Sequence, residues 1–184
     1  MNRSIEQTYD IKAAPEEVWR ALTDPQEIRE WSGANGYFIP QPGAMYTLWD
    51  GQITGKVLKV EPNVLLSQTW QPIEWTRTDS VVTFMLGRSK AGTKVVLLHE
   101  NVEDSDYDGT TEGWDIYYLG AIKKMLEKRA KSSQAAKGIK AGKTVAKRAA
   151  AKKSKPTSKS KKRAPAKKSA ARTKSLPAKK KARK

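Results

Sequence analysis

The sequence predicts an α+β fold in which a curved antiparallel sheet wraps around a long C-terminal helix, and three observations lead to it. Residues 4–12 alternate polar and apolar side chains, as a half-buried strand requires. Residues 45–102 hold short β-branched and aromatic runs separated by turn residues. Residues 111–129 carry one broad apolar stripe at helical spacing. A sheet that grips this last helix buries all of these apolar faces.

Two short helices are predicted directly after the first strand, which spans residues 4–12. Pro15 opens the first helix, because proline is tolerated at the first helical position. Asp24 is predicted to cap the second helix, with a proline directly after it and Glu27 reaching back to the cap. Gly33 is expected to end this helix, since glycine readily takes the left-handed conformation there.

The middle of the chain is predicted to be a meander of strands. Its connections are short and contain Asp-Gly, Pro-Asn and Ala-Gly pairs, which are typical of turns between antiparallel neighbours. The predicted strands are residues 45–49, 53–60, 64–70, 80–86 and 93–102.

The long last helix is predicted from apolar residues that recur at i, i+3, i+4, i+7, i+8 and i+11. They are Trp114, Tyr117, Tyr118, Ala121, Ile122 and Met125.

A sharp change in composition divides the chain into a folded domain, residues 1–130, and a basic tail, residues 131–184. The tail holds 22 of the 36 Lys and Arg, with no Asp, no Glu and no aromatic residue. Its only large aliphatic residues are Ile139, Val145 and Leu176. It therefore has little to bury and repels itself, so we expect it to be intrinsically disordered when free.

The Lys/Ala/Ser/Pro vocabulary of the tail, broken by Pro156, Pro165 and Pro177, resembles the tails of linker histones and bacterial histone-like proteins. Without aromatic residues and with Lys dominating over Arg, it is suited to neutralise phosphates rather than to read bases. Non-specific nucleic-acid binding is therefore predicted, to duplex DNA or structured RNA, with duplex DNA the favoured partner. The candidate residues are Lys147, Arg148, Lys152, Lys153, Lys161, Lys162, Arg163, Lys167, Lys168, Lys179, Lys180 and Lys181.

The same charge run has two alternative interpretations, a nuclear localisation signal or docking on anionic lipid headgroups. The number of charges and the lack of an apolar anchor favour nucleic acid. No membrane span and no signal peptide are predicted, and the expected location is cytoplasmic and nucleoid-associated, or nuclear in a eukaryote.

Several local motifs lie within residues 1–128: Pro15-Glu16-Glu17-Val18-Trp19, Ala21-Leu22-Thr23-Asp24-Pro25, Ile28-Arg29-Glu30-Trp31, Gly51 to Gly55, Gly92-Thr93, Leu98-His99-Glu100 and Glu112 to Leu119. As a series they resemble the START-like (SRPBCC) superfamily, and within it the C-terminal-domain family of the activator of heat-shock-protein-90 ATPase (AHSA-type). The resemblance implies a helix-grip fold with a pocket between the sheet and the last helix. It also implies a hydrophobic ligand or a chaperone as partner, and a ligand pocket at Trp31, Trp114, Tyr117 and Tyr118.

No catalytic residue, metal site or cofactor is predicted, and the chain is not expected to be an enzyme. It has no cysteine, which excludes thiol chemistry. Its one histidine, His99, lies next to Glu100, but adjacent residues of a strand point to opposite faces, so a hydrogen-bonded structural histidine is predicted.

One acidic segment has two interpretations. Asp104, Asp106 and Asp108 before Gly109, with Asp115 further on, match the start of a calcium-binding loop. The preceding segment is predicted to be a strand rather than a helix, which favours an acidic turn that complements the dipole of the last helix.

Overall fold

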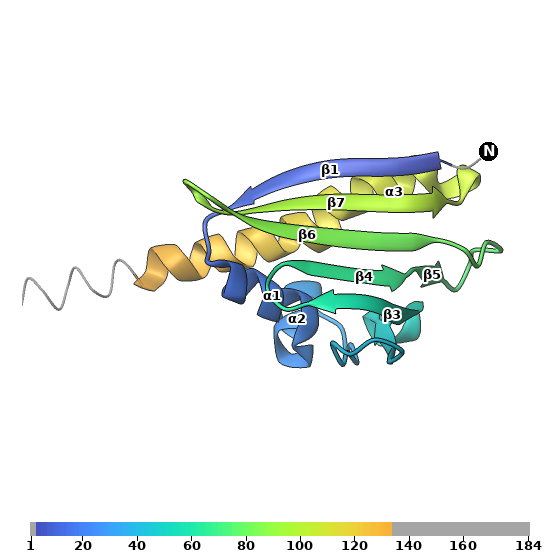
Figure 1. Cartoon of the computed structure of the whole chain (residues 1–184), viewed down its shortest axis with the longest axis horizontal. Helices are drawn as coiled ribbons and strands as arrows, with labels where there is room; N and C mark the ends of the chain where they lie inside the picture. Colours follow the sequence, from blue (N-terminus) through green and yellow to red (C-terminus); the bar gives the residue numbers. More distant parts are fainter. Residues whose placement is uncertain (1–2, 134–184) are drawn as a thin grey trace, which may run out of the picture. The chain divides into compact units, whose positions relative to one another are not determined.

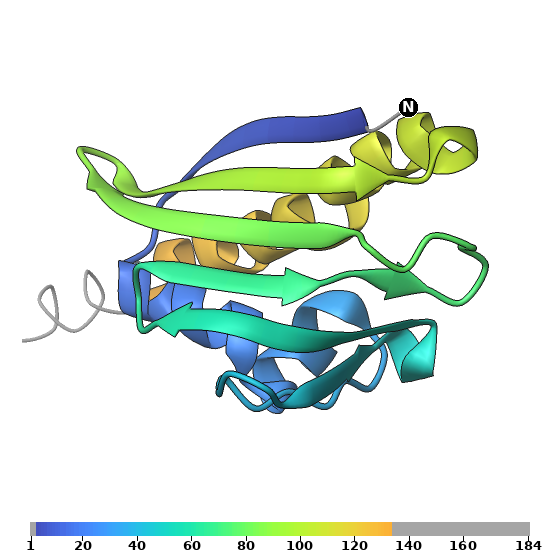
Figure 2. The same ribbon diagram turned by 45° about the vertical axis from the view of Figure 1, so that its right-hand side comes forward.

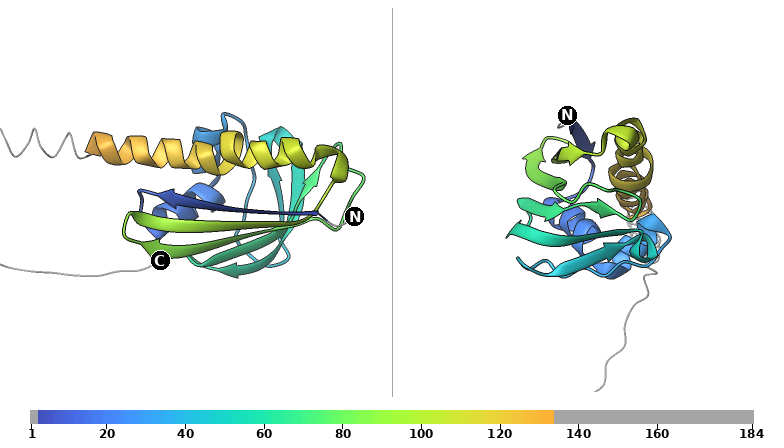
Figure 3. Two further views of the ribbon diagram at one scale, coloured as in Figure 1. Left: turned by 90° about the horizontal axis from the view of Figure 1, so that it is seen from above. Right: turned by 90° about the vertical axis from the view of Figure 1, so that its right-hand side faces the viewer.

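The computed structural model describes residues 3–133, in which seven strands form one antiparallel sheet. The strand order is β1-β7-β6-β4-β3-β2, and the short β5 pairs with β3 (Figure 1). The predicted α+β, helix-grip fold is confirmed, because the C-terminal helix crosses one face of this curved sheet (Figure 3, left). The strands are β1 (Arg3–Ile11), β2 (Met45–Leu48), β3 (Ile53–Glu61), β4 (Leu65–Thr69), β5 (Gln71–Pro72), β6 (Val81–Ser89) and β7 (Gly92–Val102).

The first strand pairs with the last one in the sequence, not with its nearest neighbour along the chain. In β1, Thr8 faces Val96 of β7 in an antiparallel register. The predicted alternation holds, since Ile5, Tyr9 and Ile11 are buried. The β1–β7 pairing therefore places the N-terminal segment beside the start of the last helix (Figure 1).

The helices α1 (Pro15–Thr23) and α2 (Pro25–Ser32) lie on the same side of the sheet as the long helix (Figure 2; Figure 3, left). Asp24 caps α2 as predicted, since its Oδ1 accepts a hydrogen bond from the backbone nitrogen of Gln26 at 2.8 Å. Gly33 ends α2 with a φ of 73°, as expected for a left-handed cap.

The predicted contact of Glu27 with its own helix cap is replaced by a contact between helices. Nη1 of Arg129 donates to Oε2 of Glu27 at 2.6 Å, and Nη2 donates to Glu30. The Arg129 guanidinium therefore ties the last helix to α2 through two carboxylates, a geometry that only the folded chain brings together.

The last helix is longer than predicted and is not α-helical throughout. It begins with the 3₁₀ turn η2 (Asp104–Asp106) and α3 (Tyr107–Gly113) and continues as the π-helical turn η3 (Trp114–Tyr118). An α-helix then covers residues 119–133. The boundary at residue 130 stays a prediction. Residues 134–184 of the tail, which hold all of the candidate nucleic-acid-binding residues, lie outside the described residues.

Candidate ligand-binding site

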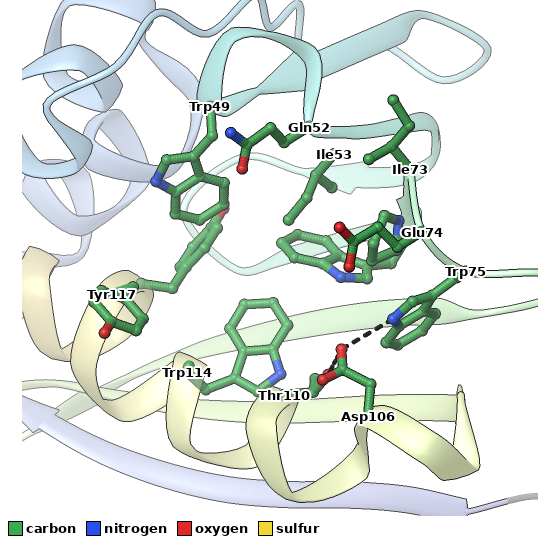
Figure 4. Close-up of a pocket in the computed structure, with 14 residues that line it drawn as sticks. Trp49, Gln52, Ile53, Ile73, Glu74, Trp75, Asp106, Thr110, Trp114 and Tyr117 are labelled. Carbon is green, nitrogen blue, oxygen red and sulfur yellow. Dashed lines mark hydrogen bonds between the residues drawn. The ribbon is translucent and has the colours of Figure 1, made fainter.

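A cavity of about 580 Å³ opens between the sheet and the last helix (Figure 4). Its walls come from the turn before β3 with the first residue of that strand, from residues 70–75 after β4, and from the last helix between η2 and η3. The lining residues are Trp49, Gln52, Ile53, Trp70, Pro72, Ile73, Glu74, Trp75, Asp106, Thr110, Gly113, Trp114, Tyr117 and Tyr118.

Six of the lining side chains are aromatic, and the inner ones touch one another. The ring centroids of Trp70 and Trp114 lie 4.7 Å apart, and those of Trp114 and Tyr118 lie 4.9 Å apart. Trp49 meets Tyr118 edge to face at 5.7 Å. Such tilted and edge-to-face pairs are the favoured aromatic geometries, so this wall is rigid and apolar.

Trp49 reaches the cavity from a strained turn. Trp49 and Asp50 both have positive φ values, 48° and 54°, which are costly for residues with a Cβ. Asn35 holds this turn in place, because its Nδ2 donates to Oδ1 of Asp50 at 2.7 Å. Strain of this kind persists only where the surroundings enforce it, and here it places an indole in the cavity wall.

The π-helical turn η3 decides which side chains of the last helix face the cavity. It gives Trp114 and Tyr118 buried positions and leaves Tyr117 at the mouth, 65% exposed. A Cβ at Gly120 would collide with the carbonyl oxygen of Asp115, so glycine permits this turn. Single π-helical turns are frequent at functional sites.

The carboxylate of Asp115 points away from the cavity and anchors the turn to β1. It accepts a hydrogen bond from the hydroxyl of Tyr9 at 2.6 Å. Burial and this hydrogen bond hold the pKa of the Tyr9 hydroxyl well above its ordinary value. The tyrosine therefore stays protonated and remains a donor to Asp115.

His99 lies directly behind the aromatic wall and is hydrogen-bonded at both nitrogens, as the sequence predicts. Nε1 of Trp114 donates to Nδ1 at 3.2 Å, and an indole N–H can only donate. The proton of the imidazole therefore sits on Nε2, 2.8 Å from the hydroxyl of Ser80. Burial lowers the pKa of His99 to about 3, so the ring is neutral.

Two carboxylates, Glu74 and Asp106, are the only ionisable acids or bases besides tyrosine among the lining residues of this cavity. Oδ2 of Asp106 accepts hydrogen bonds from Nε1 of Trp75 at 3.0 Å and from the hydroxyl of Thr110 at 3.1 Å. Both contacts appear as dashed lines in Figure 4. The cavity mouth is therefore acidic.

In the structure, the acidic segment of residues 104–108 forms the start of the last helix. Among the described residues, no group of three or more metal-binding side chains comes together. Asp106 contacts Trp75 and Thr110, and Asp115 contacts Tyr9, so these carboxylates serve the fold and the cavity wall.

Three of the four predicted pocket residues, Trp114, Tyr117 and Tyr118, line the cavity, and Trp31 does not. Nε1 of Trp31 donates to the backbone oxygen of Ala21 at 2.8 Å, which holds the indole in the core behind Tyr118. Glu74 and Asp106 were not predicted as pocket residues, because nothing in their spacing indicates that they meet at one mouth.

Comparison with known proteins agrees with this architecture. Residues 12–127 match the family described as Activator of Hsp90 ATPase homolog 1-like protein. The chain belongs to this family. A solved protein from Mesorhizobium loti is 31% identical, with a TM-score of 0.60 over 68% of this chain and 98% of that one. An HSP90 activator from Plasmodium falciparum shares the fold at 23% identity, with a TM-score of 0.60 over 69% of this chain and 96% of that one.

The chain spans about a third of the length of the curated relatives that it matches. The mouse activator of 90 kDa heat shock protein ATPase homolog 1 is 21% identical over 111 residues, 60% of this chain. An uncharacterised protein of Schizosaccharomyces pombe is 25% identical over 120 residues, 65% of this chain. The matches span 33% and 36% of these two relatives. Within residues 3–133, no helix is long and apolar enough to cross a membrane.

Proposed function

We propose that the folded domain binds a small, largely apolar molecule in the aromatic cavity and does not transform it. The observation that carries this proposal is the cavity itself, about 580 Å³ with six aromatic side chains in its wall. This volume falls within the roughly 300–1,000 Å³ of small-molecule sites, which are mostly apolar with a few polar groups at chosen points.

Binding without catalysis is supported by the state of His99. The chain has no other histidine, and both nitrogens of this one are already hydrogen-bonded behind the wall. Its low pKa also makes it a poor proton acceptor at neutral pH. The aromatic rings and the carboxylates at the mouth therefore act as recognition groups.

The test is native mass spectrometry of the full-length chain purified from cells, followed by extraction of any retained molecule. Tyr117→Ala removes an exposed ring from the mouth, so it should lose the molecule while the fold survives. Ile116→Ala is the matched control, because Ile116 is also exposed, at 41%, and does not line the cavity. Equal retention by the two variants would contradict the proposal.

Nucleic-acid binding by the tail is a second proposed function, and it rests on sequence alone. The 22 basic residues without an acidic one in residues 131–184 favour non-specific binding to duplex DNA phosphates. The tail would then hold the ligand-binding domain at the nucleoid or in the nucleus.

A salt series with a random DNA duplex tests this second function, comparing the full chain with residues 1–133. A protein that contacts about 6–10 phosphates loses roughly 10³-fold or more in affinity as salt rises from about 50 to 200 mM. We expect this steep dependence for the full chain and its loss in the shorter one. Binding of residues 1–133 as tight as that of the full chain would contradict the assignment.

A chaperone partner is a third proposal, and it rests on family membership. The family takes its description from an activator of the Hsp90 ATPase. The chain spans about a third of the mouse activator, and the partner proposed for it is an Hsp90-type chaperone. Co-purification of the full-length chain with such a chaperone, together with an ATPase assay, tests this proposal.

A further inference from the structure

We propose that the cavity prefers a cationic amphiphile, a molecule with an aromatic or otherwise apolar body that ends in an ammonium group. This inference rests on the proposed ligand-binding function and names its ligand class. Two separate features of the cavity support it, the faces of its aromatic rings and the sign of its charges.

The aromatic rings supply the first feature. The π faces of Trp and Tyr carry partial negative charge and attract cations within about 6 Å of the ring centre, with Trp the most effective. Four of the six aromatic lining residues are tryptophans: Trp49, Trp70, Trp75 and Trp114. Three of these side chains are nearly buried, with exposed fractions of 5% for Trp70, 8% for Trp75 and 2% for Trp114.

The charges supply the second feature. The lining residues include Glu74 and Asp106 but no Lys, Arg or His. Within residues 3–133, neither carboxylate takes part in an ion pair. The hydrogen bonds that Asp106 accepts come from neutral donors, Trp75 and Thr110, so its negative charge is not cancelled. An anionic ligand would meet repulsion at this mouth and a cationic one attraction.

The arrangement also sets how such a ligand lies. Trp70, Trp114 and Tyr118 form the buried end, which suits the apolar body. Figure 4 shows the Glu74 carboxylate turned toward the middle of the labelled side chains, on the side where Trp75 and Asp106 lie. The ammonium group is therefore placed at the mouth, between the two carboxylates and the Trp75 ring.

The experiment uses three fluorescent probes with one shared body: diphenylhexatriene, its trimethylammonium derivative and its propionate derivative. Each is titrated into the full-length chain and followed by probe fluorescence. We expect the cation to bind about three- to tenfold more tightly than the neutral parent, since the carboxylates are exposed and partly screened. The propionate should bind more weakly than the parent, and added salt should narrow both differences.

The charge of the mouth is tested with Glu74→Gln and Asp106→Asn, singly and combined. Asn at 106 keeps an oxygen that can accept from Trp75, and Glu74 is exposed, so both variants should fold. The combined variant should lose most of the preference for the cation over neutral diphenylhexatriene. Asp108→Asn with Glu112→Gln is the matched control, because it removes the same charge from exposed positions outside the cavity.

The outcomes test the charge preference and the ligand-binding function separately. If the neutral or anionic probe binds as tightly as the cation, the charge preference is wrong and ligand binding stands. If the control variant loses the preference as fully as the mouth variant, the overall charge is responsible and the inference is wrong. If none of the three probes binds, the ligand-binding function fails and the inference fails with it.

Discussion

Acid should destabilise this protein through the buried side chain of His99. Burial lowers its pKa to about 3 in the folded chain, whereas an unfolded histidine titrates near about 6.5. As the pH falls below the unfolded value, the unfolded chain takes up a proton that the folded chain refuses. The contribution of neutral His99 to stability is therefore complete above about pH 6.5 and is lost as the pH falls toward 3.

The size of this effect follows from the two pKa values. Between about pH 7 and pH 5 the free energy of unfolding should fall by roughly 2 kcal/mol on account of His99 alone. Because pH 5 still lies well above the folded-state pKa, this figure depends almost entirely on the unfolded value. A folded-state pKa of about 4 would leave this fall in the free energy of unfolding nearly the same.

The perturbation that isolates it is His99→Gln. A glutamine side chain offers one acceptor for Trp114 and a donor for Ser80, as the neutral imidazole does, but does not titrate. Urea unfolding of both proteins across this pH range should show wild type losing about 2 kcal/mol relative to the variant. Parallel pH profiles, or an imidazole NMR signal that titrates near its ordinary pKa in the folded protein, would refute the reasoning.

Three further substitutions, with Gly113→Ala as a control, test the cavity wall and the fold. Gly120→Ala should destabilise the protein by about 1–3 kcal/mol in thermal unfolding, because the new Cβ meets the carbonyl oxygen of Asp115. Gly113→Ala should be neutral or stabilising in the same assay, because a Cβ at Gly113 meets no other atom. Gln68→Met should be neutral or stabilise the protein by about 1 kcal/mol, since the fully buried carboxamide of Gln68 makes no hydrogen bond at either atom. A large loss of unfolding free energy in urea would contradict this. Asp24→Ala should cost about 1 kcal/mol through the lost α2 cap, measured in the same way, and an unchanged midpoint would argue against the cap.

Much of the fold was predictable because its local signals agree with one another. The alternation in β1, the Asp24 cap and the left-handed Gly33 each follow from short-range rules, and the structure confirms all three. The order of strands in the sheet is a different matter. The pairing of β1 with β7 joins residues far apart in sequence, so no local pattern records it.

The candidate site was predictable only in part. Tyr118 and Trp114 follow from the helical stripe, but the π-helical turn that orients them depends on a collision avoided at Gly120 and on an anchor at Tyr9. Trp31 is an aromatic residue like those that line the cavity, and the sequence alone does not distinguish it from them. In the structure its indole N–H donates to a backbone oxygen in the core. Tertiary contacts therefore decide whether an aromatic side chain lies in the core or lines the cavity.

Titration of neutral diphenylhexatriene into the full-length chain and into Tyr117→Ala tests ligand binding by the cavity most directly. Saturable binding by the full-length chain, with quenching of the tryptophan fluorescence and clear weakening in Tyr117→Ala, is the predicted result. Because four tryptophans line the cavity, a bound probe must contact at least one of them. Absence of saturable binding, or binding that the variant leaves unchanged, would contradict the assignment of this cavity as the functional site.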